Sequence, residues 1–196
     1  MSSASTSRPA SPATATLFDD ARNLADQGSL WEAAWTLIEG FAQLGSAASA
    51  PETDSLGRPI RGSAPRFMEQ AADYLDLLDN LERDGAVESQ QIPPRHLRWA
   101  AWHTTQGQAL AAQKLPGRAI DHLELAAGLF ESEQLSSQAI GLLAQIAQCH
   151  LLLDDPRRAE EAINRAFALL DADTRDRYAP VLGELSAEVA QKLRLR

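Results

Sequence analysis

The sequence has little cysteine and no long apolar run, and each shortage excludes a class of protein. A single cysteine, Cys149, cannot form a disulfide within the chain, which fits a reducing compartment. No stretch of about eighteen apolar residues is present, so we expect no membrane insertion. The N-terminal residues MSSASTSRPASPATAT lack the apolar core of a secretory signal. Together these absences favour a cytoplasmic protein.

Basic residues are also scarce. The chain carries 27 acidic and 18 basic side chains, which gives a formal net charge of -9. An acidic surface repels the phosphate backbone, so nucleic acid is excluded as the expected partner. What remains is an ordinary globular composition of 44% hydrophobic and 23% charged residues. At 196 residues, such a chain can bury a core without disulfides or metals.

Two segments have no helical or strand periodicity. Residues 1–13 are rich in Ser, Ala, Thr and Pro, which predicts a disordered tail before one domain over 14–196. Residues 45–65 hold three prolines and three glycines, which predicts a long flexible loop inside that domain. The rest of the sequence follows a 3.6-residue period, and no segment alternates as a half-buried strand does. The expected fold class is all-α.

Stop signals and apolar periodicity together predict eight helices. Gly28, Gly45 and Gly85 are expected to follow the first three. The sixth is expected to be capped by Ser136 or Ser137, and the eighth by Asp173 or Thr174. The predicted ranges are 14–27, 29–44, 65–84, 94–113, 116–130, 136–153, 156–170 and a last helix that ends near residue 196.

An internal repeat relates the second, fifth and seventh of these helices. Their sequences, LWEAAWTLIEGF, PGRAIDHLELAA and PRRAEEAINRAF, align without gaps from Leu30, Pro116 and Pro156. The preceding helices align in the same register. Small residues recur where a helix would cross its partner, namely Ala21, Gly107 and Ala147 in the first helix of each pair, and Ala33, Gly40, Ala119, Ala126, Ala159 and Ala166 in the second.

Paired helices with small residues at the crossing cannot bury their apolar faces alone and must stack. The pattern resembles the tetratricopeptide repeat (TPR), in a long variety with about 40 residues per unit. That resemblance implies antiparallel helical hairpins stacked as a short right-handed α-solenoid, with the eighth helix as a C-terminal cap. The helix at 65–84 fits no unit directly. It is a degenerate half-unit, a lid, or a first helix that shifts the register.

The resemblance also implies a groove lined by the first helix of each unit. The groove positions for a bound peptide or partner helix are Phe18, Arg22, Ala25, Thr104, Gln108, Ala111, Ala144, Gln148 and Leu151. Only Arg22 among them could hold a C-terminal carboxylate, so recognition of chaperone tails is not expected. Ala, Leu, Thr and Gln instead favour an apolar or amphipathic helix. Alternatively, the helix at 65–84 or the 45–65 loop fills the groove.

No catalytic or metal-binding constellation is evident. Cys149 and His150 are sequence neighbours whose side chains diverge on a helix, so they cannot form a nucleophile and base pair. His96 and His103 lie too far apart along a helix to share a metal. Glu69, Asp73 and Asp76 have helical spacing, which is typical of a solvated face. We therefore expect no enzyme, no cofactor and no metal.

Four tryptophans fall in two pairs at helical spacing, Trp31 with Trp35 and Trp99 with Trp102. Packing inside the repeats is the simpler interpretation, but Trp99 and Trp102 are also possible aromatic anchors of an interface. The resulting functional prediction is a protein-protein interaction module, an adaptor or scaffold. The alternatives are a regulatory domain that senses a small ligand or peptide, and a homodimer whose groove is self-occupied.

Overall fold

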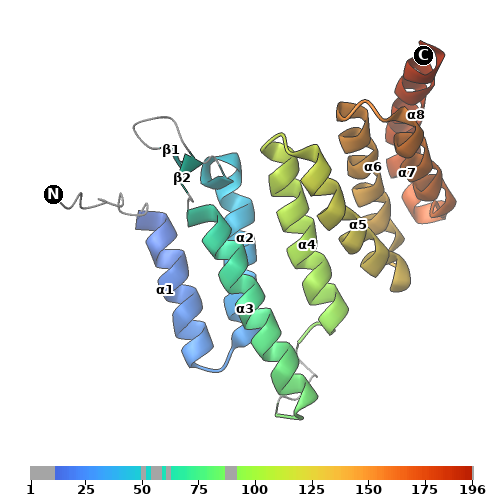
Figure 1. Ribbon diagram of the computed structural model, residues 1–196. Helices are drawn as coiled ribbons and strands as arrows, with labels where there is room; N and C mark the ends of the chain where they lie inside the picture. The colour runs from blue at the N-terminus through green and yellow to red at the C-terminus, as the bar shows by residue number, and fades with distance from the viewer. Residues whose placement is uncertain (1–11, 50–51, 54–58, 61–62, 87–91, 196) are drawn as a thin grey trace. The chain divides into compact units, whose positions relative to one another are not determined.

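A computed structural model describes residues 12–49, 52–53, 59–60, 63–86 and 92–195 (Figure 1). The chain divides into two compact units, Met1–Val87 and Glu88–Arg196. Eight helices account for nearly all of the described residues, so the predicted helical class is confirmed. Of the predicted tail, residues 1–11 lie outside the described ranges, and residues 12–13 belong to the first helix.

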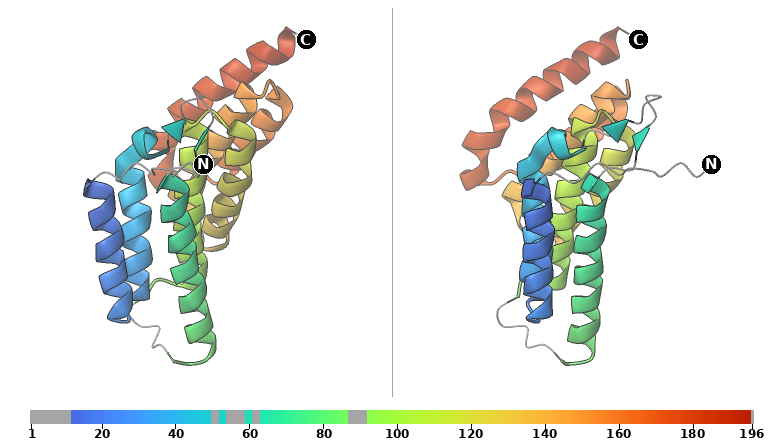
Figure 2. Two further views of the ribbon diagram at one scale, coloured as in Figure 1. Left: turned by 60° about the vertical axis from the view of Figure 1, so that its left-hand side comes forward. Right: turned by 90° about the vertical axis from the view of Figure 1, so that its left-hand side faces the viewer.

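The first unit contains three helices, α1 (Pro12–Asp26), α2 (Leu30–Ser49) and α3 (Ser63–Arg83). Helix α2 packs against both α1 and α3, and both views of Figure 2 show the three helices running alongside one another. Apolar faces meet between them, and the largest fully buried side chains are Leu37, Ile38, Phe67, Met68, Leu75 and Leu78. Helix α3 is therefore an integral part of this unit's core.

The segment predicted as a loop at 45–65 contains regular secondary structure in the parts that the structure describes. Helix α2 continues past Gly45 to Ser49, and α3 already begins at Ser63. Two short strands, β1 (Glu52–Thr53) and β2 (Pro59–Ile60), pair antiparallel with Glu52 opposite Ile60. This ladder of two residues per strand is too short to leave an alternating pattern in the sequence, and it does not change the helical class.

The second unit contains five helices, and each packs against the next in sequence. Helix α8 also contacts α6. There, Ser137 Oγ lies 3.2 Å from Tyr178 Oη, and Lys192 Nζ donates a 2.9 Å hydrogen bond to the Leu151 carbonyl. The helices are α4 (Arg95–Ala112), α5 (Pro116–Ser132), α6 (Ser136–Leu152), α7 (Pro156–Ala168) and α8 (Ala172–Arg194).

One turn geometry joins α4 to α5, α5 to α6, and α6 to α7. Each turn has three residues, and the middle one has a left-handed backbone: Lys114 at φ 59°, Gln134 at φ 58° and Asp154 at φ 55°. The two amides that end each turn bond back to the last turn of the preceding helix, as in a Schellman motif. Gly28 holds the same place between α1 and α2, at φ 85°. The connections thus recur along the chain.

The predicted caps need two corrections. Leu135, not a serine, occupies the N-cap of α6 and makes no side-chain bond, since the tight turn leaves Ser136 and Ser137 already helical. Helix α8 is capped by Asp171, which forms a capping box with Thr174. Asp155, directly before Pro156, accepts a bond from the Arg158 amide at 3.3 Å.

Candidate functional site

A pocket lies between α1 and α3 of the first unit. Phe18 of α1 stacks on the buried Phe67 of α3, with ring centroids 4.2 Å apart and planes 15° from parallel. The stack holds the two helices at a fixed distance and leaves a cavity of about 490 Å³ beside it. Its lining residues are Phe18, Asp19, Arg22, Arg66, Glu69, Gln70, Asp73 and Tyr74.

Charge and aromatic surface are combined in this pocket. Three carboxylates, Asp19, Glu69 and Asp73, share the lining with two guanidinium groups, Arg22 and Arg66, so the lining carries an excess of negative charge. Gln70 Nε2 donates a 2.8 Å hydrogen bond to the hydroxyl of Tyr74, one turn further along α3. That bond fixes two polar groups of the lining. Aromatic rings beside carboxylates form an environment suited to a cationic side chain.

The predicted groove positions divide between the units. Phe18 and Arg22 line the α1/α3 pocket, whereas Ala25 is half-buried. In the second unit Gln108 and Gln148 are exposed and Ala111 is half-buried. The remaining positions are buried in whole or in part: Ala144 is 8% exposed, Leu151 is 6% exposed, and the Thr104 hydroxyl is buried without a hydrogen-bond partner among the described residues.

The structure places Trp99 and Trp102 in an aromatic cluster on the second unit. Their ring centroids are 5.8 Å apart, and Trp102 also lies 4.9 Å from His103 and 5.5 Å from His122 of α5. The two histidines meet with Nδ1 atoms 3.0 Å apart. Burial, followed by the charge of His122, lowers the pKa of His103 to about 4. Burial also lowers the pKa of His122, an effect that Asp121 opposes and Arg118 reinforces.

Two glycines of the predicted repeat, Gly40 and Gly107, lie in close contact with a neighbouring helix. A Cβ atom at Gly40 would stand 2.8 Å from a methyl group of Leu17, and one at Gly107 would stand 2.8 Å from the Leu123 side chain. The alanines of the predicted repeat have no exposed surface; they are Ala21, Ala33, Ala119, Ala126, Ala147, Ala159 and Ala166.

His150 faces a second pocket, of about 420 Å³, formed with α5 and α7. Arg165, which also lines this pocket, has one nitrogen 2.8 Å from Glu124 and another 2.8 Å from Glu131. His150 is 7% exposed, and burial lowers its pKa, although the carboxylates around it act to raise the pKa. Cys149 is buried, and burial raises the pKa of its thiol, which disfavours the reactive thiolate.

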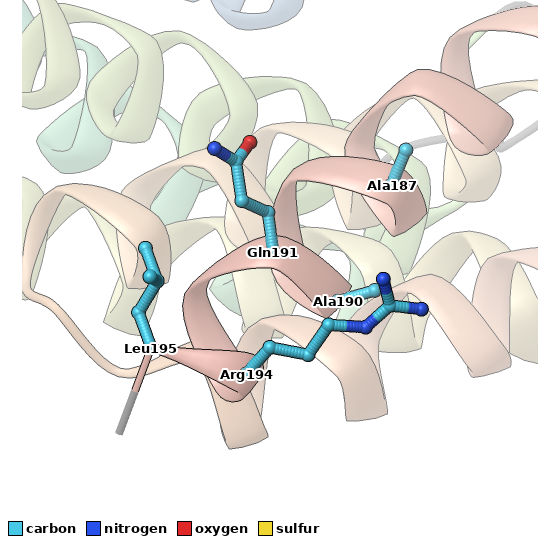
Figure 3. A pocket seen from close by; sticks show the side chains of 5 residues that line it. All are labelled: Ala187, Ala190, Gln191, Arg194 and Leu195. Atoms are coloured by element: carbon cyan, nitrogen blue, oxygen red, sulfur yellow. The ribbon is translucent and has the colours of Figure 1, made fainter.

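A third hollow, of about 380 Å³, lies on the outer side of α8 (Figure 3). Four of the five residues that line it belong to α8, and the fifth, Leu195, directly follows the helix and is 80% exposed. Two of the five are alanines, and a charged group is contributed by Arg194. A surface built from a single helix has no opposing wall, so it offers a shallow contact.

Comparison with protein-family models, curated proteins and solved structures finds no match. Within the described ranges, none of the helices combines the length and apolar character needed to cross a bilayer. Across the same residues, no three or more His, Cys, Asp or Glu side chains gather as a metal site.

Sequence reasoning missed several residues of these sites. On α3, Arg66, Gln70 and Tyr74 recur at helical spacing with Glu69 and Asp73, so their shared face was readable. Their position opposite α1 was not, because residues 45–65 leave the docking of α3 open. His122 was also missed. It and His103 lie at similar distances from the turn between α4 and α5, and such positions meet in an antiparallel hairpin.

Proposed function

We propose that this protein is a TPR-like interaction module that binds a basic segment of a partner protein in the α1/α3 pocket. The single observation that carries the proposal is the pocket itself, an aromatic and acidic cavity between two helices. An adaptor of this kind acts by holding its partner in place, and no catalytic group is required.

The packing of the helices supports the repeat resemblance. Helix α3 lies against the α1–α2 hairpin, with Phe67 on Phe18, as α8 lies against α7 and α6. In both cases a single helix follows a hairpin and covers its open side. This favours α3 as the first helix of an incomplete repeat over a lid, and favours α8 as a cap in a short solenoid. The recurring three-residue turns and the close approach at Gly107 are consistent with that arrangement.

The chemistry of the pocket selects the partner. A lysine or arginine side chain can lie against the rings of Phe18 and Tyr74 while its charge pairs with Glu69 or Asp73. Arg22 and Arg66 could hold a carboxylate, but three acidic groups share the same lining, and the whole chain is acidic. The charge balance therefore favours a basic segment over an acidic one.

Charge reversal inside the pocket tests this function. We would capture partners from the native lysate with the wild-type chain, with Glu69→Lys, and with Glu39→Lys as a matched control. Glu39 is exposed on α2 of the same unit and does not line the pocket. The expected result is a partner retained by the wild type and the control and lost by Glu69→Lys. Far-UV circular dichroism of each variant checks that the fold is intact.

A competition assay then tests the chemistry of recognition. A short peptide rich in arginine is expected to displace the captured partner, while a glutamate-rich peptide of equal length leaves it bound. Equal capture by all three proteins would contradict the assignment of the pocket. Displacement by both peptides, or by neither, would contradict recognition of a basic segment while leaving an interaction role intact.

A further inference from the structure

Two of the four histidines in the second unit, His103 and His122, lie close together although they belong to different helices. His103 extends from α4 and His122 from α5, and their Nδ1 atoms are 3.0 Å apart. The ring centroids are separated by 5.2 Å, with planes tilted by 38°. Helices α4 and α5 pack against each other and are joined by a tight three-residue turn. This hairpin sets the distance between the two histidines.

Burial lowers the pKa of both rings, which favours the neutral imidazole over the charged form. A neutral imidazole has one protonated nitrogen and one free lone pair. At 3.0 Å, one Nδ1 donates a hydrogen bond to the lone pair of the other. Neutral imidazole is also the form in which histidine binds transition metals, so no proton has to be removed by a change of pH.

The spacing of the two nitrogens fits a metal ion. Zinc–nitrogen bonds of about 2.0–2.1 Å at a tetrahedral angle place the two nitrogens roughly 3.3 Å apart. The observed 3.0 Å therefore differs by a few tenths of an ångström, a change that rotation of the rings supplies without moving either helix. We propose that His103 and His122 form a two-histidine site for a borderline divalent ion, Zn²⁺, Ni²⁺ or Cu²⁺.

The site would be open on the side away from the protein ligands. No group of three His, Cys, Asp or Glu side chains gathers in the described parts of the chain, so the protein supplies two ligands here. Water, or a donor atom of a bound molecule, completes the coordination. Asp121 favours a cation beside His122, and Arg118 opposes it. The proposed metal site is separate from the α1/α3 pocket, because it is formed by α4 and α5 of the second unit.

Binding of the metal ion changes the position of one proton and leaves the number of protons on the two rings unchanged. In the metal-free pair the donating ring carries its proton on Nδ1. When the ion binds both Nδ1 atoms, that proton is released to solvent and Nε2 of the same ring takes one up. Both rings then carry their proton on Nε2 and remain neutral. The change of tautomer is a specific consequence of binding at this pair.

Nearby tryptophans provide the first readout. Trp102 lies 4.9 Å from the His103 ring and 5.5 Å from the His122 ring, so a paramagnetic ion between the histidines quenches its fluorescence. We would titrate the full chain with NiCl₂ at pH 7.5 and measure the Zn²⁺ stoichiometry by calorimetry. One ion per chain is expected. Absence of saturable binding, or several equivalent ions, would overturn the proposal.

Matched variants locate the ion. His122→Gln removes one of the two proposed ligands. His96→Gln is the control, because His96 belongs to the same unit and, with Glu133 at 3.1 Å, forms another pair of side chains that could bind the ion. His122→Gln should weaken Ni²⁺ binding by more than the roughly tenfold that loss of even an outer-sphere partner costs. His96→Gln should bind as the wild type does. The opposite pattern, or equal loss in both, would assign the ion elsewhere.

A measurement on the wild-type chain needs no variant. Long-range ¹H–¹⁵N spectra of the histidine rings, recorded with and without ZnCl₂, report which nitrogen carries the proton. Added Zn²⁺ is expected to convert the pair to two Nε2–H rings while the other two histidines keep their signals. If the tautomers of the pair do not change although Zn²⁺ binds, the two-histidine site is refuted.

Discussion

Gly107 on α4 is the position where one added methyl group tests the hairpin packing most directly. In Gly107→Ala, the new Cβ would stand 2.8 Å from both Cγ and Cδ2 of Leu123 and 3.2 Å from its backbone nitrogen. Leu123 has no exposed surface, and its backbone lies within α5, so the clash cannot be relieved by a side-chain rotation alone. The two helices must separate.

Two opposing terms set the magnitude. Alanine is a better helix former than glycine by about 1 kcal/mol, which stabilises the variant. Overpacking a close-packed interior costs about 1–3 kcal/mol, and contact with a backbone atom points to the upper half of that range. The expected net effect is a loss of about 1–2 kcal/mol in the free energy of unfolding, from the difference between these two terms.

Other glycines in the chain provide the controls. Gly128 of α5 and Gly183 of α8 have no heavy atom within 4 Å of the added Cβ, so their alanine variants should gain about 0.5–1 kcal/mol. Gly40→Ala would meet only the end of the half-buried Leu17 side chain, which can move, and should be close to neutral.

Urea unfolding followed by far-UV circular dichroism measures all four variants under one set of conditions. The decisive comparison is Gly107→Ala against Gly128→Ala, because the same residues are exchanged within one unit. If both variants are stabilised to the same extent, the close approach of α4 and α5 is refuted. The small residues of the repeat would then require another explanation.

Further predictions concern the turns, the core and a buried histidine. Lys114→Gly and Gln134→Gly relieve left-handed backbones and should each stabilise the protein by about 0.5–1 kcal/mol in urea unfolding; a loss in both would contradict the turn geometry. Ala126→Leu fills a site with no exposed surface and should cost about 1–3 kcal/mol; an unchanged unfolding midpoint would contradict it. Because burial lowers the pKa of His150, the unfolded chain binds a proton below pH 6.5 that the folded chain does not, so stability falls as the pH falls. His150 aligns with Leu24 and Leu110 in the repeat register of the sequence. His150→Leu should therefore reduce that loss between pH 6.5 and 5; an identical pH dependence would argue against a neutral buried imidazole.

Local sequence patterns predicted most of the helices well, because individual glycine and proline residues mark where many of them begin or end. Gly28 and Gly85 supply left-handed turns, and Pro116 and Pro156 begin helices where a missing amide costs nothing. The end of α2 was predicted too early, since Gly45 followed by small helix-compatible residues does not force a stop. A glycine permits a helix end and does not impose one.

The candidate sites were less predictable because they depend on contacts between helices. Phe18 and Arg22 were placed in a groove through the repeat alignment, but the α3 residues opposite them follow a segment whose path the pattern did not define. His103 was compared with His96 on its own helix, where the distance excluded a shared ion. Its actual neighbour, His122, lies across the turn. Periodicity along one helix carries no information on which face meets another.

The recurrence of one turn geometry has a consequence for how such a chain can change its length. The turn that precedes Pro116 and the turn that precedes Pro156 have the same three-residue form, with a left-handed middle residue in each. A duplicated copy of the segment from Pro116 to Asp155, inserted before Pro156, would begin and end in backbone conformations that already fit. Each added copy would bring two such turns, around Gln134 and Asp154, and its own small residues. Tandem duplication could therefore extend the molecule by a fixed increment, and the number of copies would be a simple variable for evolution or for construction in the laboratory.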